Sequence, residues 1–226
     1  MPFLTRYVDD ESRPDVIPAL RDLALRAVGP AIGVWFAIVG IGLLIQGPGG
    51  GLRSEDTISR DVQAGRTPLW DSVTLVWSRS GNTEIIIGIC LVAVALIWWR
   101  TRQWWVAVIP GVAIALQAAV FVIATALVGR DRPPVDHLDP APPTSSYPSG
   151  HVGASTALYL SFALIAQRIT HPVLRRAVTV ACLVIPFLVA WARLYRGMHH
   201  VSDIVVGAAN GVACALLAWG YLRRRG

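Results

Sequence analysis

Charged residues are scarce in this chain of 226 residues: 15% are Asp, Glu, Lys or Arg, whereas soluble domains contain about 25%. Hydrophobic residues make up 54% of the chain, and the mean hydropathy is +0.53. This composition disfavours a soluble globular domain and indicates an integral membrane protein. A membrane-spanning helix uses about 20 apolar residues, so the chain has room for six spans and not for twelve.

Lysine is absent, so all 20 basic residues are arginine, against 14 acidic residues and a net charge of +6. Any bound anion must therefore be held by guanidinium groups, whose planar fork suits carboxylate and phosphate. The arginines lie mostly at the ends of apolar runs and form no stripe interleaved with aromatic residues. This placement favours membrane lipids as the partner and disfavours nucleic acid.

Cysteine is also scarce, and Cys90, Cys182 and Cys214 each lie inside an apolar run. An odd, scattered set indicates buried apolar side chains rather than a disulfide framework or a metal site. Near the N-terminus, Asp9 and Asp10 occupy the place where a signal peptide carries basic residues. We therefore expect no cleavable signal and a first span that stays in the protein.

Six apolar runs predict the fold class, an all-α polytopic membrane protein with six transmembrane helices around a helical-bundle core. The whole chain, residues 1–226, is expected to form a single membrane-embedded domain. The six runs cover residues 27–46, 84–99, 104–128, 151–168, 177–192 and 201–222.

Two amphipathic segments accompany these spans and are expected to contribute interfacial helices. In residues 1–26, apolar side chains recur at helical spacing from Ile17 onwards, which predicts a helix on the cytoplasmic surface. In residues 47–83, a second helix is expected to begin at Thr67 and Pro68, on the extracytoplasmic surface. Its tryptophans, Trp70 and Trp77, are expected to line the entry for a lipid.

The arginines also predict the orientation in the membrane. Twelve of the 20 flank span ends on the side that carries both termini, and an excess of arginine marks the cytoplasmic side, so we expect both termini to be cytoplasmic and the opposite side to be extracytoplasmic. The connections after the third and the fifth span leave the membrane together on the other side, whatever the orientation. These two connections hold the candidate site residues, Arg132, Ser149, Gly150, His151, Arg193, His199 and Asp203.

The residue types in these two connections suit an anionic ester. Arg132 and Arg193 are candidates for bidentate contacts to phosphate oxygens. Ser149 and Gly150 directly precede a predicted helix, where free backbone N–H groups and the helix dipole favour an anion.

Histidines in both connections can supply a nucleophile and an acid. A neutral imidazole attacks phosphorus, while a second, protonated imidazole donates to the leaving oxygen. His199 and Asp203 are four residues apart, so on one helical face the carboxylate would hold one ring N–H of His199. His200 is rotated by about 100° and could not use Asp203 in this way. This spacing does not decide between His199 and His151 as the attacking group.

The motifs resemble the type 2 phosphatidic acid phosphatase superfamily, membrane lipid phosphatases related to vanadium-dependent haloperoxidases. The pattern of that superfamily is K-x6-R-P, then P-S-G-H, then S-R-x5-H-x3-D. Arg132 and Pro133 close the first part, Pro148 to His151 form the second, and Arg193, His199 and Asp203 match the third. The order of the apolar runs fits as well, so the resemblance covers most of the chain.

The resemblance implies that His199 forms a phosphohistidine, that Asp203 is its partner, and that His151 protonates the leaving group. It implies hydrolysis of a lipid phosphate or diphosphate, with polyprenyl diphosphate favoured by the expected orientation of the site. No metal or cofactor is expected. The implied phosphate-binding residues are Arg132, Ser149, Gly150 and Arg193.

Two positions depart from the pattern. Its first lysine falls at Thr125 and its serine at Ala192. We hypothesise that Arg130 replaces the missing cation, because it lies two residues before Arg132.

Two alternative functions remain open. One is a metal-dependent hydrolase, and the other is a binding or transport protein that keeps the anion site without turnover. Asp136 and Asp139, beside His137, are expected to belong to a solvated, proline-rich rim. The metal ligands of the first alternative would be His137, His151, His199 and Asp203.

Overall fold

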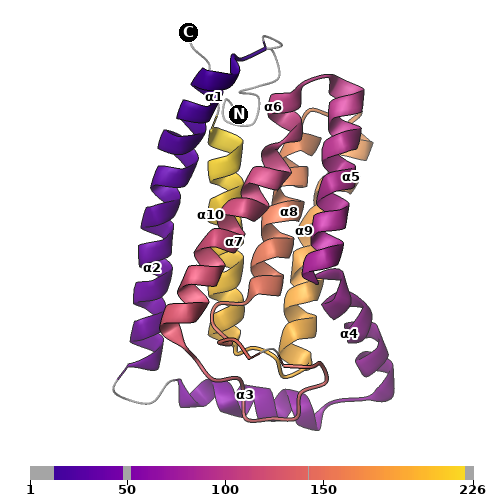
Figure 1. The fold of residues 1–226 in the computed structure, drawn as a ribbon. Coiled ribbons are helices and arrows are strands. Elements are labelled where there is room, and N and C mark those ends of the chain that lie inside the picture. Colours follow the sequence, from indigo (N-terminus) through magenta and orange to yellow (C-terminus); the bar gives the residue numbers. More distant parts are fainter. Residues whose placement is uncertain (1–12, 48–51, 142, 222–226) are drawn as a thin grey trace.

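Helices are the only regular elements in the computed structural model, which describes residues 13–47, 52–141 and 143–221 (Figure 1). The all-α membrane fold is thereby confirmed, and each of the six predicted runs overlaps an apolar helix. One of these six apolar helices, α8 (Gly150–Ala166), is shorter than the others. The five helices long enough to cross a membrane are Val16–Gln46, Thr83–Thr101, Trp104–Val128, Pro172–Tyr195 and Val201–Gly220.

The first span begins earlier than predicted. α1 (Val16–Leu23), a π-helical turn (Ala24–Val28) and α2 (Gly29–Gln46) follow one another without a break. Pro30 lacks an N–H, and its ring clashes with the carbonyl four residues back in a regular helix. In the wide turn before it, the N–H of Gly29 bonds to the carbonyl of Ala24, five residues back, so the helix continues.

The interfacial helix expected in residues 1–26 is therefore not a separate element where the structure describes it. Its residues from Val16 onwards are the start of the first span. Residues 1–12, the remainder of that expectation, lie outside the described residues.

Residues 52–81 form two helices where the sequence predicted one. α4 (Pro68–Ser80) forms as expected, and the Thr67 side chain accepts a hydrogen bond from the N–H of Trp70 at its start. α3 (Arg53–Ala64) was not predicted, because its buried face carries the polar residues Glu55 and Ser59 instead of an apolar stripe. Figure 1 shows α3 lying across one end of the bundle, opposite the start of α1.

The centre of the bundle is α8, which packs against α7 (Ile109–Val128), α9 (Pro172–Tyr195) and α10 (Val201–Gly220). The remaining elements are peripheral. α2 packs against α7 and α10, α5 (Thr83–Thr101) contacts α7 and α8, and the short helix α6 (Trp104–Ala107) leads into α7.

Two glycines bring α10 close to α8. A Cβ atom at Gly207 would lie 2.5 Å from the carbonyl oxygen of Ser149, and one at Gly211 would lie 2.5 Å from that of Gly153. Any larger residue at these positions would push the two helices apart. The close approach places the first turn of α8 beside the loop that precedes α10, at the end of the bundle that α3 covers (Figure 1).

Candidate active site

A cavity of about 330 Å³ brings the two loops together. Five of the seven predicted site residues line it, from four parts of the chain: the loop after α7, the start of α8, the last turn of α9, and the loop between α9 and α10. Ser149 and Asp203 do not line it, and both are fully buried. The five lining residues are Arg132, Gly150, His151, Arg193 and His199.

Apart from Thr83 and Gln117, the wall of this cavity that α5 and α7 form is apolar, so a polar headgroup and an apolar tail could occupy the cavity together. Trp70 and Trp77, which were expected at the entry, do not line the cavity. The apolar wall comes instead from α5 and α7, through Ile86, Ile87, Ile114, Ala118 and Phe121.

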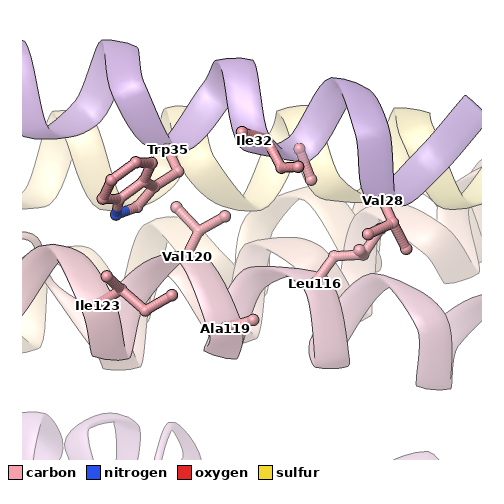
Figure 2. Close-up of a pocket in the computed structure, with 8 residues that line it drawn as sticks. Val28, Ile32, Trp35, Leu116, Ala119, Val120 and Ile123 are labelled. Carbon is pink, nitrogen blue, oxygen red and sulfur yellow. The ribbon is translucent and has the colours of Figure 1, made fainter. Parts of the chain in front are cut away.

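A second cavity, of about 320 Å³, lies between α2 and α7 (Figure 2). It has no ionisable residue in its lining, so it offers no group for acid–base or nucleophilic chemistry. Its walls are Val28, Ala31, Ile32, Trp35, Leu116, Ala119, Val120 and Ile123.

His199 is held by a backbone carbonyl. Its Nδ1 lies 2.7 Å from the carbonyl oxygen of Ser146, and the side chain is buried. A carbonyl only accepts hydrogen bonds, so Nδ1 carries the proton and the lone pair of the neutral ring lies on Nε2. Burial and the nearby Arg193 guanidinium hold the pKa of His199 well below its usual range, which keeps the ring neutral. His199 thus has the electronic state of a nucleophile.

Asp203 does not hold His199 as the spacing predicted. Its Oδ2 lies 4.0 Å from Nδ1 of His199, beyond hydrogen-bond distance. The same oxygen accepts the backbone N–H of His200 at 2.8 Å and lies 3.3 Å from Nδ1 of that residue. The reason is local: His200 is the N-cap of α10, so His199 precedes the helix and shares no helical face with Asp203.

Arg130 does not replace the missing lysine. Its guanidinium donates to Asp203 at 2.6 Å and to Glu55 of α3 at 2.8 Å, and Arg130 does not line the cavity. Glu55 also accepts the backbone N–H of Ser202 at 2.7 Å. Arg130 therefore ties α3 to the first turn of α10, and the hypothesis that it binds substrate in place of a lysine at Thr125 is wrong for this geometry.

Arg193 is held by the loop that was expected to be a solvated rim. One of its terminal nitrogens, Nη1, donates to Asp139 at 2.9 Å and to Ser78 of α4 at 2.8 Å. The other oxygen of Asp139 accepts from Arg196 at 2.8 Å. Asp139 is thus a partly buried carboxylate between two buried arginines. The pairing leaves the buried Nε of Arg193 without a hydrogen-bond partner.

The remaining anion-binding candidates, Arg132, Ser149 and Gly150, differ in their surroundings. Arg132 lines the cavity and donates to the carbonyl of Met198 at 2.7 Å, which ties it to the residue before His199. The Oγ of Ser149 is buried without a hydrogen-bond partner and does not cap α8. Gly150 has the ring of Phe121 about 3 Å from where a Cβ would lie, so a side chain would not fit there.

His151 meets a residue that sequence reasoning missed. Its Nε2 lies 3.1 Å from Oδ1 of Asn82, at the start of α5. Asn82, Asp139 and Glu55 belong to no motif and are distant in the chain from the residues they contact, and Ser146 lies just outside the P-S-G-H motif. No signal in the local sequence indicates these contacts.

The metal-dependent alternative finds no support in the positions of its proposed ligands. His137 lies 3.1 Å from the carbonyl of Pro133 through its Nε2 and does not line the cavity. Among the residues that the structure describes, no three His, Cys, Asp or Glu side chains are grouped as a metal site.

Fold and site together define a class: a helical membrane protein whose cavity presents two arginines and two histidines to an anion beside an apolar wall. Residues 106–226 match the PAP2 superfamily, and the chain belongs to this superfamily of lipid phosphatases, which are hydrolases of phosphoric esters. The resemblance stated from the motifs is thereby confirmed.

Two solved structures share the fold. A transmembrane PAP2-type phosphatidylglycerolphosphate phosphatase from Bacillus subtilis is 18% identical, with a TM-score of 0.74 over 87% of this chain and 98% of that one. LpxE from Aquifex aeolicus is 21% identical, with a TM-score of 0.55 over 72% of this chain and 92% of that one. No curated protein sequence matches.

Proposed function

We propose that the protein hydrolyses a lipid phosphate or diphosphate through a phosphohistidine on His199. The observation that carries this proposal is the pairing of His199 and His151 in one cavity with Arg132 and Arg193. Imidazoles on two sides of a bound phosphate suit an in-line displacement, and the arginines suit its equatorial oxygens.

The reaction has two steps. The Nε2 lone pair of His199 attacks phosphorus, the bond to the lipid oxygen breaks, and that oxygen takes a proton from His151. Water then attacks the phosphohistidine and gives a proton back to His151, which releases inorganic phosphate and restores His199. Arg132 and Arg193 hold the phosphate oxygens, and the backbone N–H of Gly150 at the start of α8 adds a donor, whereas that of Ser149 is bonded to the carbonyl of Asp203 at 2.9 Å. In this scheme no step uses a metal.

The apolar wall of the cavity supports a lipid substrate. A headgroup beside the histidines leaves the tail along Ile86 and Ile87 of α5 and Ile114 of α7. These helices are both long enough to span a membrane. The tail can therefore remain in the bilayer while the phosphate is cleaved at its edge.

We assign the site to the extracytoplasmic face. The support is the distribution of arginines along the chain. Arg100 is in the last turn of α5 and Arg175 in the first turn of α9, and these helix ends lie away from α3 (Figure 1). On this face polyprenyl diphosphate is the favoured substrate. A phosphatidylglycerol phosphate is the second candidate, because the Bacillus subtilis structural neighbour is named for it.

Phosphate release by the purified protein tests the proposal. The panel is a polyprenyl diphosphate, phosphatidylglycerol phosphate and phosphatidic acid, each offered to wild type, His199→Ala and His137→Ala. We expect release by wild type and His137→Ala, in excess EDTA as well, and none by His199→Ala. Release by His199→Ala contradicts the mechanism, and loss in His137→Ala together with EDTA sensitivity favours the metal-dependent alternative. Binding without release by wild type favours the binding or transport protein.

A further inference from the structure

Asn82 occupies a helix N-terminus, where an asparagine side chain normally caps the first turn. It is the N-cap residue of α5, with extended backbone angles of φ −63° and ψ 146°. Asparagine is favoured there because its side-chain oxygen accepts a backbone N–H of the first turn, worth about 1 kcal/mol. The Asn82 side chain makes no such bond.

The Asn82 carboxamide bonds to His151 instead. Its Oδ1 lies 3.1 Å from Nε2 of the ring, across 69 residues of sequence. Gly81 permits this approach, because a Cβ there would lie 3.0 Å from Cγ1 of Val189 and 3.3 Å from Cδ2 of His151. Both Gly81 and His151 line the cavity. Asn82, between α4 and α5, therefore binds the ring of His151 and leaves the first turn of α5 without a side-chain cap.

This bond fixes which nitrogen of His151 faces the substrate. The carboxamide oxygen accepts, so Nε2 keeps its proton in the neutral ring. Among the described residues, this is the one hydrogen bond that the His151 ring makes. Nδ1 is therefore the nitrogen left for the leaving group.

We propose that Asn82 is a positioning residue that holds His151 with Nε2–H toward α5 and Nδ1 toward the lipid oxygen. This inference rests on the function proposed above and deepens it. The Nδ1–H of the protonated ring passes its proton to the leaving oxygen as the P–O bond breaks. The ring is left neutral with Nε2–H still bonded to Asn82. The same Nδ1 then accepts the proton of the attacking water.

The effect of an Asn82 substitution on substrates with different leaving groups separates a positioning role from a structural one. 4-Nitrophenyl phosphate releases a stable anion that needs no proton, whereas benzyl phosphate releases an alkoxide that does. Both are measured as kcat/KM, which reports the steps up to phosphohistidine formation, for wild type, Asn82→Leu and Asn82→Asp. Leucine removes the acceptor at similar size, and aspartate retains it.

General acid catalysis contributes about 10²- to 10⁴-fold, so a misplaced acid should cost a substantial part of that range. We expect Asn82→Leu to lose at least about tenfold on benzyl phosphate and to stay within about twofold on 4-nitrophenyl phosphate, with Asn82→Asp near wild type on both. His151→Ala should show the same selectivity as Asn82→Leu in a stronger form. Equal loss on both substrates in Asn82→Leu, or no loss on either, overturns the inference.

A second measurement does not depend on turnover. Nitrogen-15 NMR of labelled histidine, with the His151 signals assigned by their absence in His151→Gln, reports which ring nitrogen is protonated. At a pH where the ring is neutral, we expect Nε2–H in wild type and a mixture of tautomers in Asn82→Leu. A neutral ring protonated at Nδ1 in wild type overturns the inference. Turnover by His199→Ala would instead overturn the proposed function, so the two failures are distinguishable.

Discussion

The Nδ1 atom of His199 lies 2.7 Å from the carbonyl oxygen of Ser146, while the nearest oxygen of Asp203 is 4.0 Å away. A neutral carbonyl therefore sets the tautomer of the proposed nucleophile. Asp203 acts on the ring of His199 through its charge, at longer range. Only Tyr147 separates Ser146 from the P-S-G-H motif, so the loop proposed to contact the phosphate also orients the ring of the proposed nucleophile. The two motifs depend on each other through this bond.

Asp203→Asn should reduce the stability of the protein as well as its turnover. The carboxylate accepts from Arg130 and from the backbone of His200, and it is fully buried. Removing one partner of a buried ion pair costs about 3–5 kcal/mol, reduced here because Glu55 still binds Arg130. Thermal unfolding in detergent should show a lower Tm for Asp203→Asn, and a smaller decrease for His199→Ala, which loses one buried hydrogen bond but no ion pair. Equal Tm values for wild type and Asp203→Asn would contradict this account of the carboxylate.

The pH dependence of kcat/KM should lack the acid limb of an ordinary histidine. Burial and Arg193 lower the pKa of His199, so the ring of the free protein stays neutral as the pH falls through the usual histidine value of about 6.5. The nucleophile is therefore available on both sides of that pH, and protonation inactivates it only at lower pH. The substrate phosphate itself titrates near pH ~6, so the profile is corrected for that ionisation. A remaining acid limb near pH ~6.5 that disappears when His199 is replaced would show that its pKa is not lowered.

Asp139→Ala should weaken anion binding, because it leaves Arg193 and Arg196 buried without their shared carboxylate. We expect a lower Tm and about tenfold weaker inhibition by vanadate, an analogue of the phosphoryl group in transfer. Asp136→Ala is the matched control in the same loop. Its side chain accepts an exposed hydrogen bond from Gln63, so its effect on stability should stay within about 0.5 kcal/mol. Similar behaviour of the two variants would refute the role given to Asp139.

Gly207→Ala should disrupt the site by displacing Ser149 at the start of α8. The added Cβ would lie 2.5 Å from the carbonyl of Ser149, and backbone must shift to accommodate it. Overpacking of this kind costs about 1–3 kcal/mol, and it moves the start of α8 away from α10, so turnover should fall. Gly111→Ala in α7 is the control, since nothing lies within 4 Å of its added Cβ. Alanine there should stabilise the helix by up to about 1 kcal/mol. Full turnover in Gly207→Ala would mean that the close approach of the helices is dispensable.

The sequence predicts the spans and most of the polar side chains that line the cavity, because both have local signatures. Apolar runs of membrane length mark the helices, and the spacing within each motif identifies Arg132, His151, Arg193 and His199. The continuous first helix escapes prediction because Pro30 is normally a helix boundary, and the π-helical turn that accommodates it has no clear pattern.

The contacts that complete the site could not be predicted from the sequence. The group that accepts the hydrogen bond of His199 is the backbone carbonyl of Ser146, and every residue type has such a carbonyl. α3 buries carboxylate rather than apolar surface, so periodicity does not reveal it. The partner of Asp203 depends on whether His199 lies inside or before α10, and helix boundaries are the least certain feature of a sequence-based prediction.

The most direct test of the central claim is to trap the phosphorylated protein. Wild type is mixed with a lipid phosphate labelled with phosphorus-32, quenched within one turnover under alkaline conditions that preserve phosphohistidine, digested, and analysed by mass spectrometry. The account predicts an acid-labile phosphate on the peptide that contains His199, absent from His199→Ala. Label on His151, acid-stable label on a serine, or turnover without any covalent phosphate would contradict it.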